Sequence, residues 1–279
     1  MRISGNTILI AGGTSGIGFE LARRFLSLDN TVIVTGRSES KLDAARRNLR
    51  GVHAIQSDVS DVIAITRLYR RMVSEFPGLN VLINNAGIMR KINLHNLPAD
   101  LHDITREVEI NLDGPIRMVA QFLPNLKRQE RAAIVNVSSG LGFVPLAIAP
   151  VYCATKAAIH SFTQSLRLQL KNTKVVVFEL APPITETALF KDGISVSDAG
   201  VKPMDVKKLV QDAIAGIEND RLEIRPGLSN LLKIMSRLVP DFIVQRLGRS
   251  VDGMLAENGG TNLRRSNHDA KNELLDRSS

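Results

Sequence analysis

The sequence predicts an α/β fold: a doubly wound, Rossmann-like parallel sheet of about seven strands with helices on both faces. Strand-like and helix-like segments alternate along the chain, which is the pattern of that fold. Several strand segments are near-continuous apolar runs, such as Val81-Leu82-Ile83, as expected for strands that are covered on both faces. The first strand also leads into a glycine-rich turn that opens a helix.

Seven strands are expected, at 6–11, 31–35, 51–57, 79–84, 131–138, 174–180 and 222–225. Helices are expected in the gaps, near 16–28, 39–49, 60–76, 100–126, 152–171 and 204–217. Residues 228–247 carry apolar side chains at helical spacing and are expected to form a further helix. We expect one dinucleotide-binding and catalytic domain over 1–256, then a disordered tail over 257–279 that is polar and mixed in charge.

The turn after the first strand carries Gly12, Gly16 and Gly18 in a Gly-x-x-x-Gly-x-Gly spacing. Gly12 allows a tight turn, Gly16 lets a pyrophosphate approach the backbone, and Gly18 allows close helix–strand packing. The helix that follows directs its positive end at phosphate. A glycine-rich turn without a ligand is the alternative, but its place at the first strand–helix connection favours a dinucleotide site.

The end of the second strand predicts which dinucleotide binds. An NAD enzyme of this fold usually places an acid there, which binds the ribose 2′-hydroxyl. In Val-Ile-Val-Thr-Gly-Arg (32–37) that position is Gly36, so no carboxylate repels a 2′-phosphate. Arg37 follows and can donate charge-assisted hydrogen bonds to that phosphate. NADP is therefore expected, with NAD as the alternative if Arg37 only stacks on adenine. Ser15 occupies the place of the other common basic contact, inside the glycine turn.

A third motif predicts proton transfer. Tyr152 and Lys156 lie four residues apart, on one face of an expected helix, and Ser139 precedes the tyrosine by thirteen residues. An ammonium about 4 Å from a phenolate stabilises it by about 4 kcal/mol at an effective dielectric near 20, which would lower the phenol's pKa from its ordinary value of about 10. Ser139 can donate a hydrogen bond to a substrate oxygen. Together the motifs indicate hydride transfer between a nicotinamide and a carbonyl or alcohol.

Over roughly residues 3–226 the chain resembles the short-chain dehydrogenase/reductase family, in its compact single-domain form. The resemblance rests on the glycine turn, Asn84-Asn85-Ala86-Gly87 after the fourth strand, Val137-Ser138-Ser139 ending the fifth, and the Tyr152–Lys156 pair. The first sixty residues and Ile224-Arg225-Pro226-Gly227 further resemble its DltE-like branch, named from teichoic-acid D-alanylation operons.

The resemblance implies a catalytic tetrad of Asn111, Ser139, Tyr152 and Lys156. Tyr152 would be the acid/base and Ser139 would orient the carbonyl. Lys156 would lower the tyrosine's pKa and hold the nicotinamide ribose, and Asn111 would hold a water that links Lys156 to solvent. The implied cofactor-binding residues are Gly12, Thr14, Ser15, Gly16, Ile17, Gly18, Arg37, Asp58, Val59, Asn85, Ala86, Gly87, Tyr152, Lys156, Pro182, Thr185 and Thr187.

Some of these residues have specific implied contacts. Asp58 would meet the adenine amino group, Asn85 and Ala86 would line the adenosine, and Thr187 would meet the nicotinamide carboxamide. Two positions depart from the family pattern. Ala11 replaces a threonine that braces the glycine turn, and Pro182-Pro183 replaces Pro-Gly after the sixth strand. The second proline lacks an N–H, so the path beside the nicotinamide is expected to differ.

Composition excludes several classes of function. The net charge of +8 attracts anions, but no long Lys/Arg block or aromatic-studded basic motif accompanies it, so nucleic acid is not an expected partner. Cys153 is the single cysteine, and the five histidines show no ligand spacing, so no metal is expected. A chain with one cysteine and no visible N-terminal signal is expected in the cytoplasm. The uncharged stretch 132–155 houses the catalytic motif and is not read as a membrane anchor.

The expected partner is a small carbonyl or alcohol substrate, and the expected assembly is a homodimer or homotetramer. The segment 188–203 is either a loop that closes over substrate or an ordinary connection. Helix 228–247 is expected to pack on the protein, at the pocket or at a subunit contact, and not to anchor in lipid. The competing function is a catalytically silent dinucleotide-binding protein, a redox sensor or partner. Tyr152 with Lys156 argues against it, since a sensor needs neither.

Overall fold

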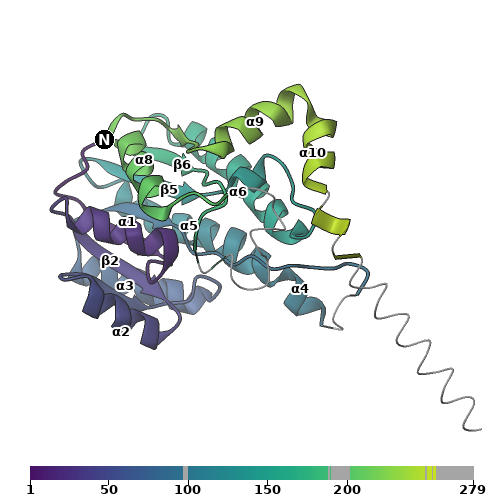
Figure 1. The fold of residues 1–279 in the computed structure, drawn as a ribbon. Coiled ribbons are helices and arrows are strands. Elements are labelled where there is room, and N and C mark those ends of the chain that lie inside the picture. Colours follow the sequence, from purple (N-terminus) through teal and green to yellow (C-terminus); the bar gives the residue numbers. More distant parts are fainter. Residues whose placement is uncertain (97–99, 188, 190–201, 249, 253, 256–279) are drawn as a thin grey trace, which may run out of the picture.

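The computed structural model describes residues 1–96, 100–187, 189, 202–248, 250–252 and 254–255. Its centre is a parallel sheet of seven strands: β1 (Thr7–Ala11), β2 (Thr31–Gly36), β3 (His53–Gln56), β4 (Leu79–Asn84), β5 (Ala132–Val137), β6 (Val175–Leu180) and β7 (Glu223–Ile224). They lie in the order β3-β2-β1-β4-β5-β6-β7, and every neighbouring pair is parallel (Figure 1). The predicted fold class and all seven predicted strands are confirmed.

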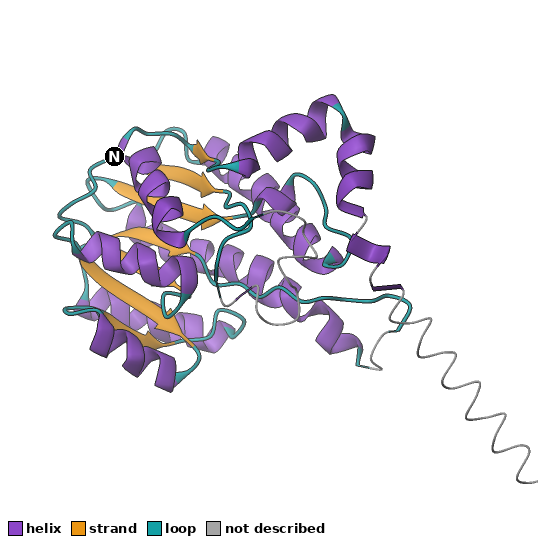
Figure 2. Ribbon diagram, in the orientation of Figure 1, coloured by secondary structure: helices purple, strands orange, loops and turns teal. Residues whose placement is uncertain are grey.

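Helices cover both faces of the sheet (Figure 2). One face carries α1 (Gly16–Leu26), α2 (Glu39–Asn48) and α8 (Val206–Glu218), and the other carries α3 (Val62–Glu75), α5 (Gly114–Leu126) and α6 (Pro150–Gln169). Successive side chains of a strand point to opposite faces. Ile8 and Ile10 of β1 therefore join the first core, whereas Leu9 and Ala11 join the second. This double burial explains why the strands read as unbroken apolar runs.

The strand order places the ligand crevice. The chain runs from β1 to β3 in one direction across the sheet, then returns to β4 on the other side of β1. In open α/β sheets the crevice lies at such a reversal, outside the carboxyl ends of the strands. The first glycine turn and the segment after β4 flank this point, and Asn85 N–H donates to the carbonyl of Ala11 across it at 3.2 Å.

The predicted helix 100–126 is interrupted in the structure. It consists of α4 (Leu101–Val108), a π-helical turn η1 (Glu109–Asp113) and α5. A π turn is rare and is found mostly at functional sites. This one contains the predicted catalytic residue Asn111, whose side chain is buried. The sequence carries no signal for the interruption except Pro115 in the first turn of α5.

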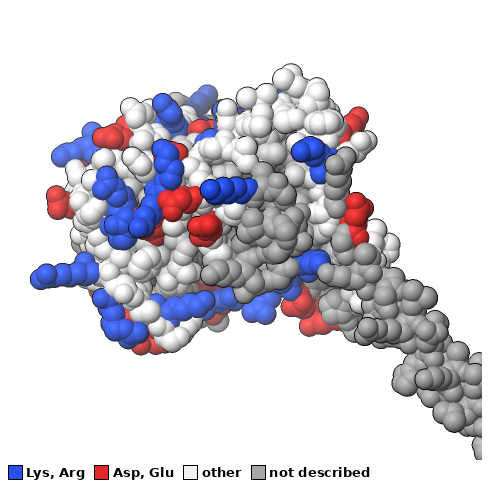
Figure 3. Space-filling view, viewed as in Figure 1, with Lys and Arg blue, Asp and Glu red and all other residues white. Residues whose placement is uncertain are grey.

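The predicted helix 228–247 is two helices, α9 (Leu228–Leu238) and α10 (Pro240–Gly248). The break falls at Val239, because proline disfavours helical geometry in the residue before it and cannot donate to the preceding turn. The side chains that α9 buries most deeply are not its apolar ones. Ser229 and Lys233 are buried, whereas the apolar residues Leu231 and Leu238 are 48% and 75% exposed. In Figure 3 the surface over α9 is largely free of charge.

Two sequence expectations lie outside the described residues. The tail 257–279 is one, and most of the segment 188–203 is the other. Among the described residues, no helix is both long and apolar enough to cross a membrane.

Candidate active site

The glycine turn is held by steric contacts. Gly12 has a φ of +75°, and a Cβ atom there would lie 2.6 Å from the Cα of Ala86. At Gly18 a Cβ atom would lie 2.3 Å from the carbonyl oxygen of Gly12, so a side chain would push α1 away from the strand end. Both positions require glycine. The N-terminus of α1 therefore stays beside the end of β1, where its backbone N–H groups favour an anion.

Backbone and amide contacts brace this turn in place of a threonine hydroxyl. The N–H groups of Gly12 and Gly13 both donate to the carbonyl of Thr35 on β2, at 3.0 and 3.1 Å. The side-chain amide of Asn85 donates to the Gly12 carbonyl at 2.8 Å. The turn is thus tied to β2 and to the segment after β4. These ties explain how the chain accommodates Ala11, which has no hydroxyl, at the end of β1.

A cleft along the carboxyl ends of the strands brings together most of the predicted site residues. Its lining includes Gly12, Thr14, Ser15, Gly16, Ile17, Arg37, Asp58, Val59, Asn85, Ala86, Gly87, Ser139, Tyr152, Lys156, Pro182, Thr185 and Thr187. Gly18 and Asn111 lie behind this lining. Gly18 acts in packing, as the sequence predicts, and Asn111 supports the wall from the helix side.

One end of the cleft is basic and has no acid on β2. A Cβ atom on Gly36 would lie 2.9 Å from the Thr14 methyl group, so the place of the acid is filled. Arg37, Ser38 and Lys41 line the cleft next to it. Lys41 and Ser38 are missing from the sequence-predicted site. The signal was available, because Lys41 follows Arg37 by four residues in the first turn of the helix predicted from 39.

The opposite end of the cleft holds the predicted catalytic groups. Ser139, which follows β5, lies near enough to Tyr152, near the start of α6, for its hydroxyl to lower the pKa of the phenol. The ammonium of Lys156 lies 5.6 Å from the centre of the tyrosine ring and donates to the carbonyl of Val137 at 2.9 Å. Tyr152 and Lys156 are 6% and 5% exposed, so their chemistry is shielded from bulk water.

Asn111 clamps the segment after β4. Its side-chain oxygen accepts the N–H of Ile88 at 2.9 Å, and its amide donates to the Ile88 carbonyl at 2.8 Å and to Thr155 at 3.2 Å. A Cβ atom on Gly87 would lie 3.2 Å from the Asn111 oxygen and 3.7 Å from the Lys156 ammonium, so all three meet. The side-chain amide is therefore committed to protein partners. The water-holding role implied for Asn111 stays a prediction.

The electrostatics of the site differ from the expectation for Tyr152. Burial raises the pKa of its phenol, hydrogen bonding to Ser139 lowers it, and the charges of Cys153, when that thiol is ionised, and of Glu107 raise it further. The net direction is upward. Burial also lowers the pKa of Lys156 to about 8, which weakens the charge that would stabilise a phenolate. Among the protein's own groups, desolvation thus outweighs the predicted effect of the lysine.

The segment after β6 carries the double proline Pro182-Pro183. The Pro182 carbonyl accepts the N–H of Gly140, which follows Ser139, at 2.8 Å. Beyond Pro183 the chain returns to the glycine turn, where a Cβ atom on Gly16 would lie 3.2 Å from the side chain of Thr187. Thr187 therefore lies beside the turn that faces phosphate. Its implied contact with the carboxamide stays a prediction.

Asp58 lies in the lining of the cleft, after β3. One oxygen of its carboxylate accepts the N–H and the hydroxyl of Ser60, at 2.9 and 2.8 Å. These bonds fix the carboxylate in the cleft lining. The implied contact of Asp58 with the adenine amino group stays a prediction.

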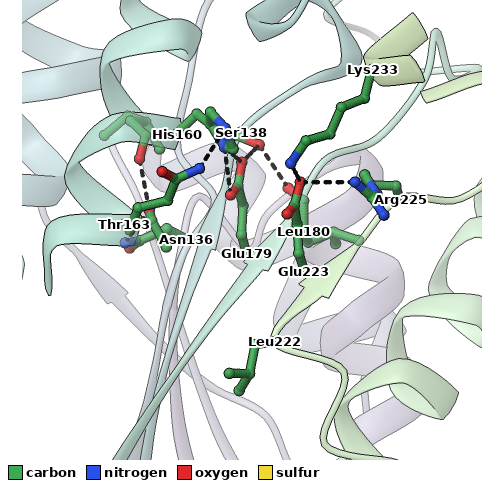
Figure 4. A network of polar contacts seen from close by, with 12 residues as sticks. Asn136, Ser138, His160, Thr163, Glu179, Leu180, Leu222, Glu223, Arg225 and Lys233 are labelled. Carbon is green, nitrogen blue, oxygen red and sulfur yellow. Dashed lines mark hydrogen bonds and ion pairs between the residues drawn. The ribbon is translucent and has the colours of Figure 1, made fainter. Parts of the chain in front are cut away.

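A polar network is built around Ser138, the residue before Ser139 (Figure 4). Ser138 donates to the buried carboxylate of Glu179 at 2.5 Å, and His160 contacts the same carboxylate at 2.8 Å. Glu223 pairs with the ammonium of Lys233 from α9. Ligand atoms of His160, Glu179 and Glu223 lie within 4.8 Å of one another, as a metal site would require. Because Lys233 already supplies a cation to Glu223, this network has its own charge compensation.

Cys153 is a packing residue beside the tyrosine. Its sulfur accepts the N–H of Leu146 at 3.2 Å and is buried. Burial raises the pKa of its thiol to about 11, so the thiolate required of a nucleophile is scarce at neutral pH.

A parallel sheet with a glycine turn at its reversal point and a Ser–Tyr–Lys cluster over its carboxyl edge is the architecture of a dinucleotide-dependent oxidoreductase. The family model for short chain dehydrogenases matches residues 6–195. The chain belongs to that family of oxidoreductases. The resemblance seen in the sequence is thereby confirmed.

Relatives support the same branch. The chain is 43% identical over 224 residues to the uncharacterised oxidoreductase DltE of Bacillus subtilis. The aligned region covers 80% of this chain and 89% of DltE. It is 33% identical over 176 residues to the NADP-dependent 3-hydroxy acid dehydrogenase YdfG of Salmonella typhi, covering 63% and 71%. A short-chain dehydrogenase from Sphingobium yanoikuyae, solved with NADPH, superimposes with a TM-score of 0.73 at 28% identity, covering 85% and 96%.

Proposed function

We propose that this protein is an NADP-dependent oxidoreductase that interconverts a small carbonyl compound and a secondary alcohol. One observation carries the proposal: a single cleft joins a basic end around Arg37 to a buried Ser139–Tyr152–Lys156 cluster. The first end suits a 2′-phosphate and the second suits proton transfer to a carbonyl oxygen. The NADP-dependent YdfG and the NADPH-bound Sphingobium structure agree with this assignment.

The residues of the cleft fit the cofactor. Gly12 and Gly18 keep the α1 N-terminus where a pyrophosphate can approach it. Gly36 offers no carboxylate, and the exposed Arg37 and Lys41 can donate charge-assisted bonds to a 2′-phosphate. A bound NADPH supplies the hydride that adds to the carbonyl carbon.

The protein's own groups handle the proton. Ser139 donates a hydrogen bond to the carbonyl oxygen and fixes its position. Tyr152 gives its phenolic proton to that oxygen as the hydride reaches the carbon, and the resulting phenolate then recovers a proton from solvent. Lys156 stabilises the phenolate while its ammonium is charged. In alcohol oxidation the same proton moves back to Tyr152.

The test is NADPH oxidation with a panel of carbonyl substrates, in wild type and Tyr152→Phe. We expect Tyr152→Phe to lose about 10²–10⁴ in kcat, because a general acid is removed, while NADPH affinity is nearly unchanged. Tyr69→Phe is the matched control, since Tyr69 lies on α3 far along the chain from the cluster. More than half of wild-type activity in Tyr152→Phe would refute the mechanism. Binding of NADPH without turnover of any carbonyl would favour the silent alternative.

A further inference from the structure

Glu179 is a buried carboxylate that the proposed mechanism does not use. It lies near the end of β6, and its side chain has no exposed surface. Acidic side chains are almost never fully buried unless they are paired. Ser138 donates its hydroxyl to one carboxylate oxygen at 2.5 Å, and Nδ1 of His160 lies 2.9 and 2.8 Å from the two oxygens. Both oxygens therefore have partners, and those partners indicate the role of the carboxylate.

The two partners of Glu179 come from the two segments that carry the predicted catalytic groups. Ser138 directly precedes Ser139, and His160 follows Lys156 by four residues on α6. Residues four apart lie on one face of a helix, so His160 continues the face that carries Lys156. Glu179 thus bridges the serine segment after β5 and the helix of the tyrosine (Figure 4).

Ser139 is held through the bonds of its neighbour. The Ser138 N–H donates to the Leu180 carbonyl of β6 at 2.8 Å, and the Ser138 hydroxyl reaches Glu179 on the same strand. The side-chain oxygen of Ser139 accepts the N–H of Leu141 at 3.1 Å, so its own proton remains to be donated. Main chain and side chain thus both attach the residue before Ser139 to β6.

The helix of the tyrosine is attached to the same segment at a second point. Lys156 donates to the carbonyl of Val137 at 2.9 Å. The two stretches of chain also approach closely, because a Cβ atom on Gly142 would lie 2.9 Å from the backbone carbonyl of Lys156. Two links therefore set the spacing between the serine segment and α6: this lysine bond, and the bridge through Glu179. Of these two links, only the bridge can be cut without changing a residue of the predicted tetrad.

We propose that Glu179 and His160 are positioning residues. By bridging Ser138 to α6, they hold the Ser139 hydroxyl where it and the Tyr152 phenol can bind one carbonyl oxygen. The inference deepens the proposed function and rests on that shared oxygen. Neither Glu179 nor His160 lines the cleft, so both act through the residues that do. Their effect is geometric, since a displacement of about 1 Å in a reacting group can cost about 10²-fold in rate.

The test cuts the bridge and restores it. Glu179→Leu removes both bonds at similar volume, whereas Glu179→Gln keeps an acceptor for Ser138 and, with the other imidazole tautomer, a donor to His160. Ser138→Ala cuts the bridge at the serine alone, and it decides the question if Glu179→Leu does not fold. Asn30→Ala is the matched control, because it breaks buried hydrogen bonds just before β2, at the opposite edge of the sheet. It should lower the stability without moving Ser139.

Two readouts follow the bridge. In a Tyr69→Phe background Tyr152 is the only tyrosine, so the NMR signal of ¹³C-labelled tyrosine reports on its contact with the Ser139 hydroxyl. We expect Glu179→Leu and Ser138→Ala to move this signal toward its position in Ser139→Ala, and Glu179→Gln to leave it close to the parent. In a carbonyl assay, kcat should fall by about ten- to a hundredfold in the first two variants, with NADPH affinity unchanged. In a Ser139→Ala background the same substitutions should cost kcat almost nothing more.

The proposal is overturned if the Tyr152 signal moves no more in Glu179→Leu and Ser138→Ala than in Asn30→Ala. It is also overturned if the loss of kcat is as large in the Ser139→Ala background as in wild type, because the glutamate then acts through stability and not through the serine. The NMR comparison needs no turnover. An enzyme that reduces no carbonyl would therefore sink the proposed function, while the signal still decides whether the bridge positions Ser139.

Discussion

Lys156 loses its charge within the range of pH in which the enzyme can be assayed. Burial lowers the pKa of its ammonium to about 8, so the charge is present below pH 8 and is lost above it. A neutral lysine can no longer attract the anionic cofactor. We expect NADPH binding, measured by nicotinamide fluorescence, to weaken as the pH rises from 7 to 9.5. In Lys156→Met the affinity should be lower and flat with pH. A wild-type affinity that is constant across this range would contradict the expectation.

Cofactor preference is a second property of single residues. Charge-assisted hydrogen bonds are worth roughly 1.5–3 kcal/mol each, about ten- to hundredfold in binding. We expect wild type to prefer NADPH over NADH in kcat/KM, Arg37→Ala to lose most of that preference, and Arg37→Ala with Lys41→Ala to abolish it. Arg47→Ala is the control, because Arg47 is exposed on α2, the helix that carries Lys41, and does not line the cleft. A preference that survives the double substitution would place the 2′-phosphate elsewhere.

The sequence predicted most of these residues because their chemistry depends on local spacing. Four residues on a helix place Tyr152 and Lys156 together, and a strand followed by glycines places a phosphate. Lys41 was missed although its spacing from Arg37 was visible. Glu179 could not be predicted, because its role comes from contacts with Ser138 and His160 on other elements. The direction of the Tyr152 pKa also depends on burial, which only the packed structure reveals.

At the scale of elements, one ion pair among the described residues joins α9 to the sheet. Lys233 binds Glu223 of β7 and lies over the ring of Phe143 at 5.1 Å, at the end of the turn that Ser139 begins. The pair fixes the rotation of α9 and explains why its polar side faces inward. Sequence periodicity predicted a helix here but not its rotation, because a hydrophobic stripe is normally assumed to face the core.

The stability that this pair provides should depend on pH. Burial alone would raise the pKa of Glu223, but the hydrogen bond and charge of Lys233 lower it by more, and the net direction is downward. An acid whose pKa is lower in the folded state than in the unfolded state stabilises the fold at pH values above its unfolded-state pKa. That stabilisation is lost as the pH falls through the folded-state pKa. We expect Glu223→Gln to cost about 1.5–3 kcal/mol in urea unfolding at pH 7, and much less at pH 3.

Glu218→Gln is the control for that experiment, since Glu218 is an exposed acid at the end of α8. A loss in Glu223→Gln that is equally large at pH 3 would mean that the glutamate acts through packing and not through its charge.

At the scale of the whole molecule, α9 and α10 present an apolar surface to solvent. It comprises Leu228, Leu231, Ile234, Leu238, Val239, Phe242 and Val244, each more than 40% exposed. None of these residues lines the cleft. A lipid-binding helix needs exposed cations beside its apolar face. Lys233 is buried against Glu223, so Arg237 and Arg246 are the exposed cations in the described part of these helices, which is few beside seven exposed apolar residues. We propose that a second copy of the chain covers the surface, as the expected homodimer or homotetramer would.

Leu231→Gln with Leu238→Gln should shift the mass measured by light scattering toward the monomer, with the fold retained by circular dichroism. Leu168→Gln is the control, because Leu168 is 71% exposed on α6. Binding to anionic vesicles tests the alternative that a membrane, and not a second copy of the chain, covers this surface. Strong co-sedimentation that the double substitution abolishes, with a monomeric wild type, would favour the membrane and refute the subunit contact.

The close contact between Gly36 and Thr14 limits how the enzyme can be re-engineered. Converting an NADP enzyme to NAD usually means restoring an acid at the end of the second strand. Here the new Cβ atom would lie 2.9 Å from the Thr14 methyl group, so Gly36→Asp alone would force the Thr14 side chain to move. Replacing Thr14 with alanine at the same time removes that methyl group and the steric conflict. The two positions form one coupled design unit, and a screen of single substitutions would overlook it.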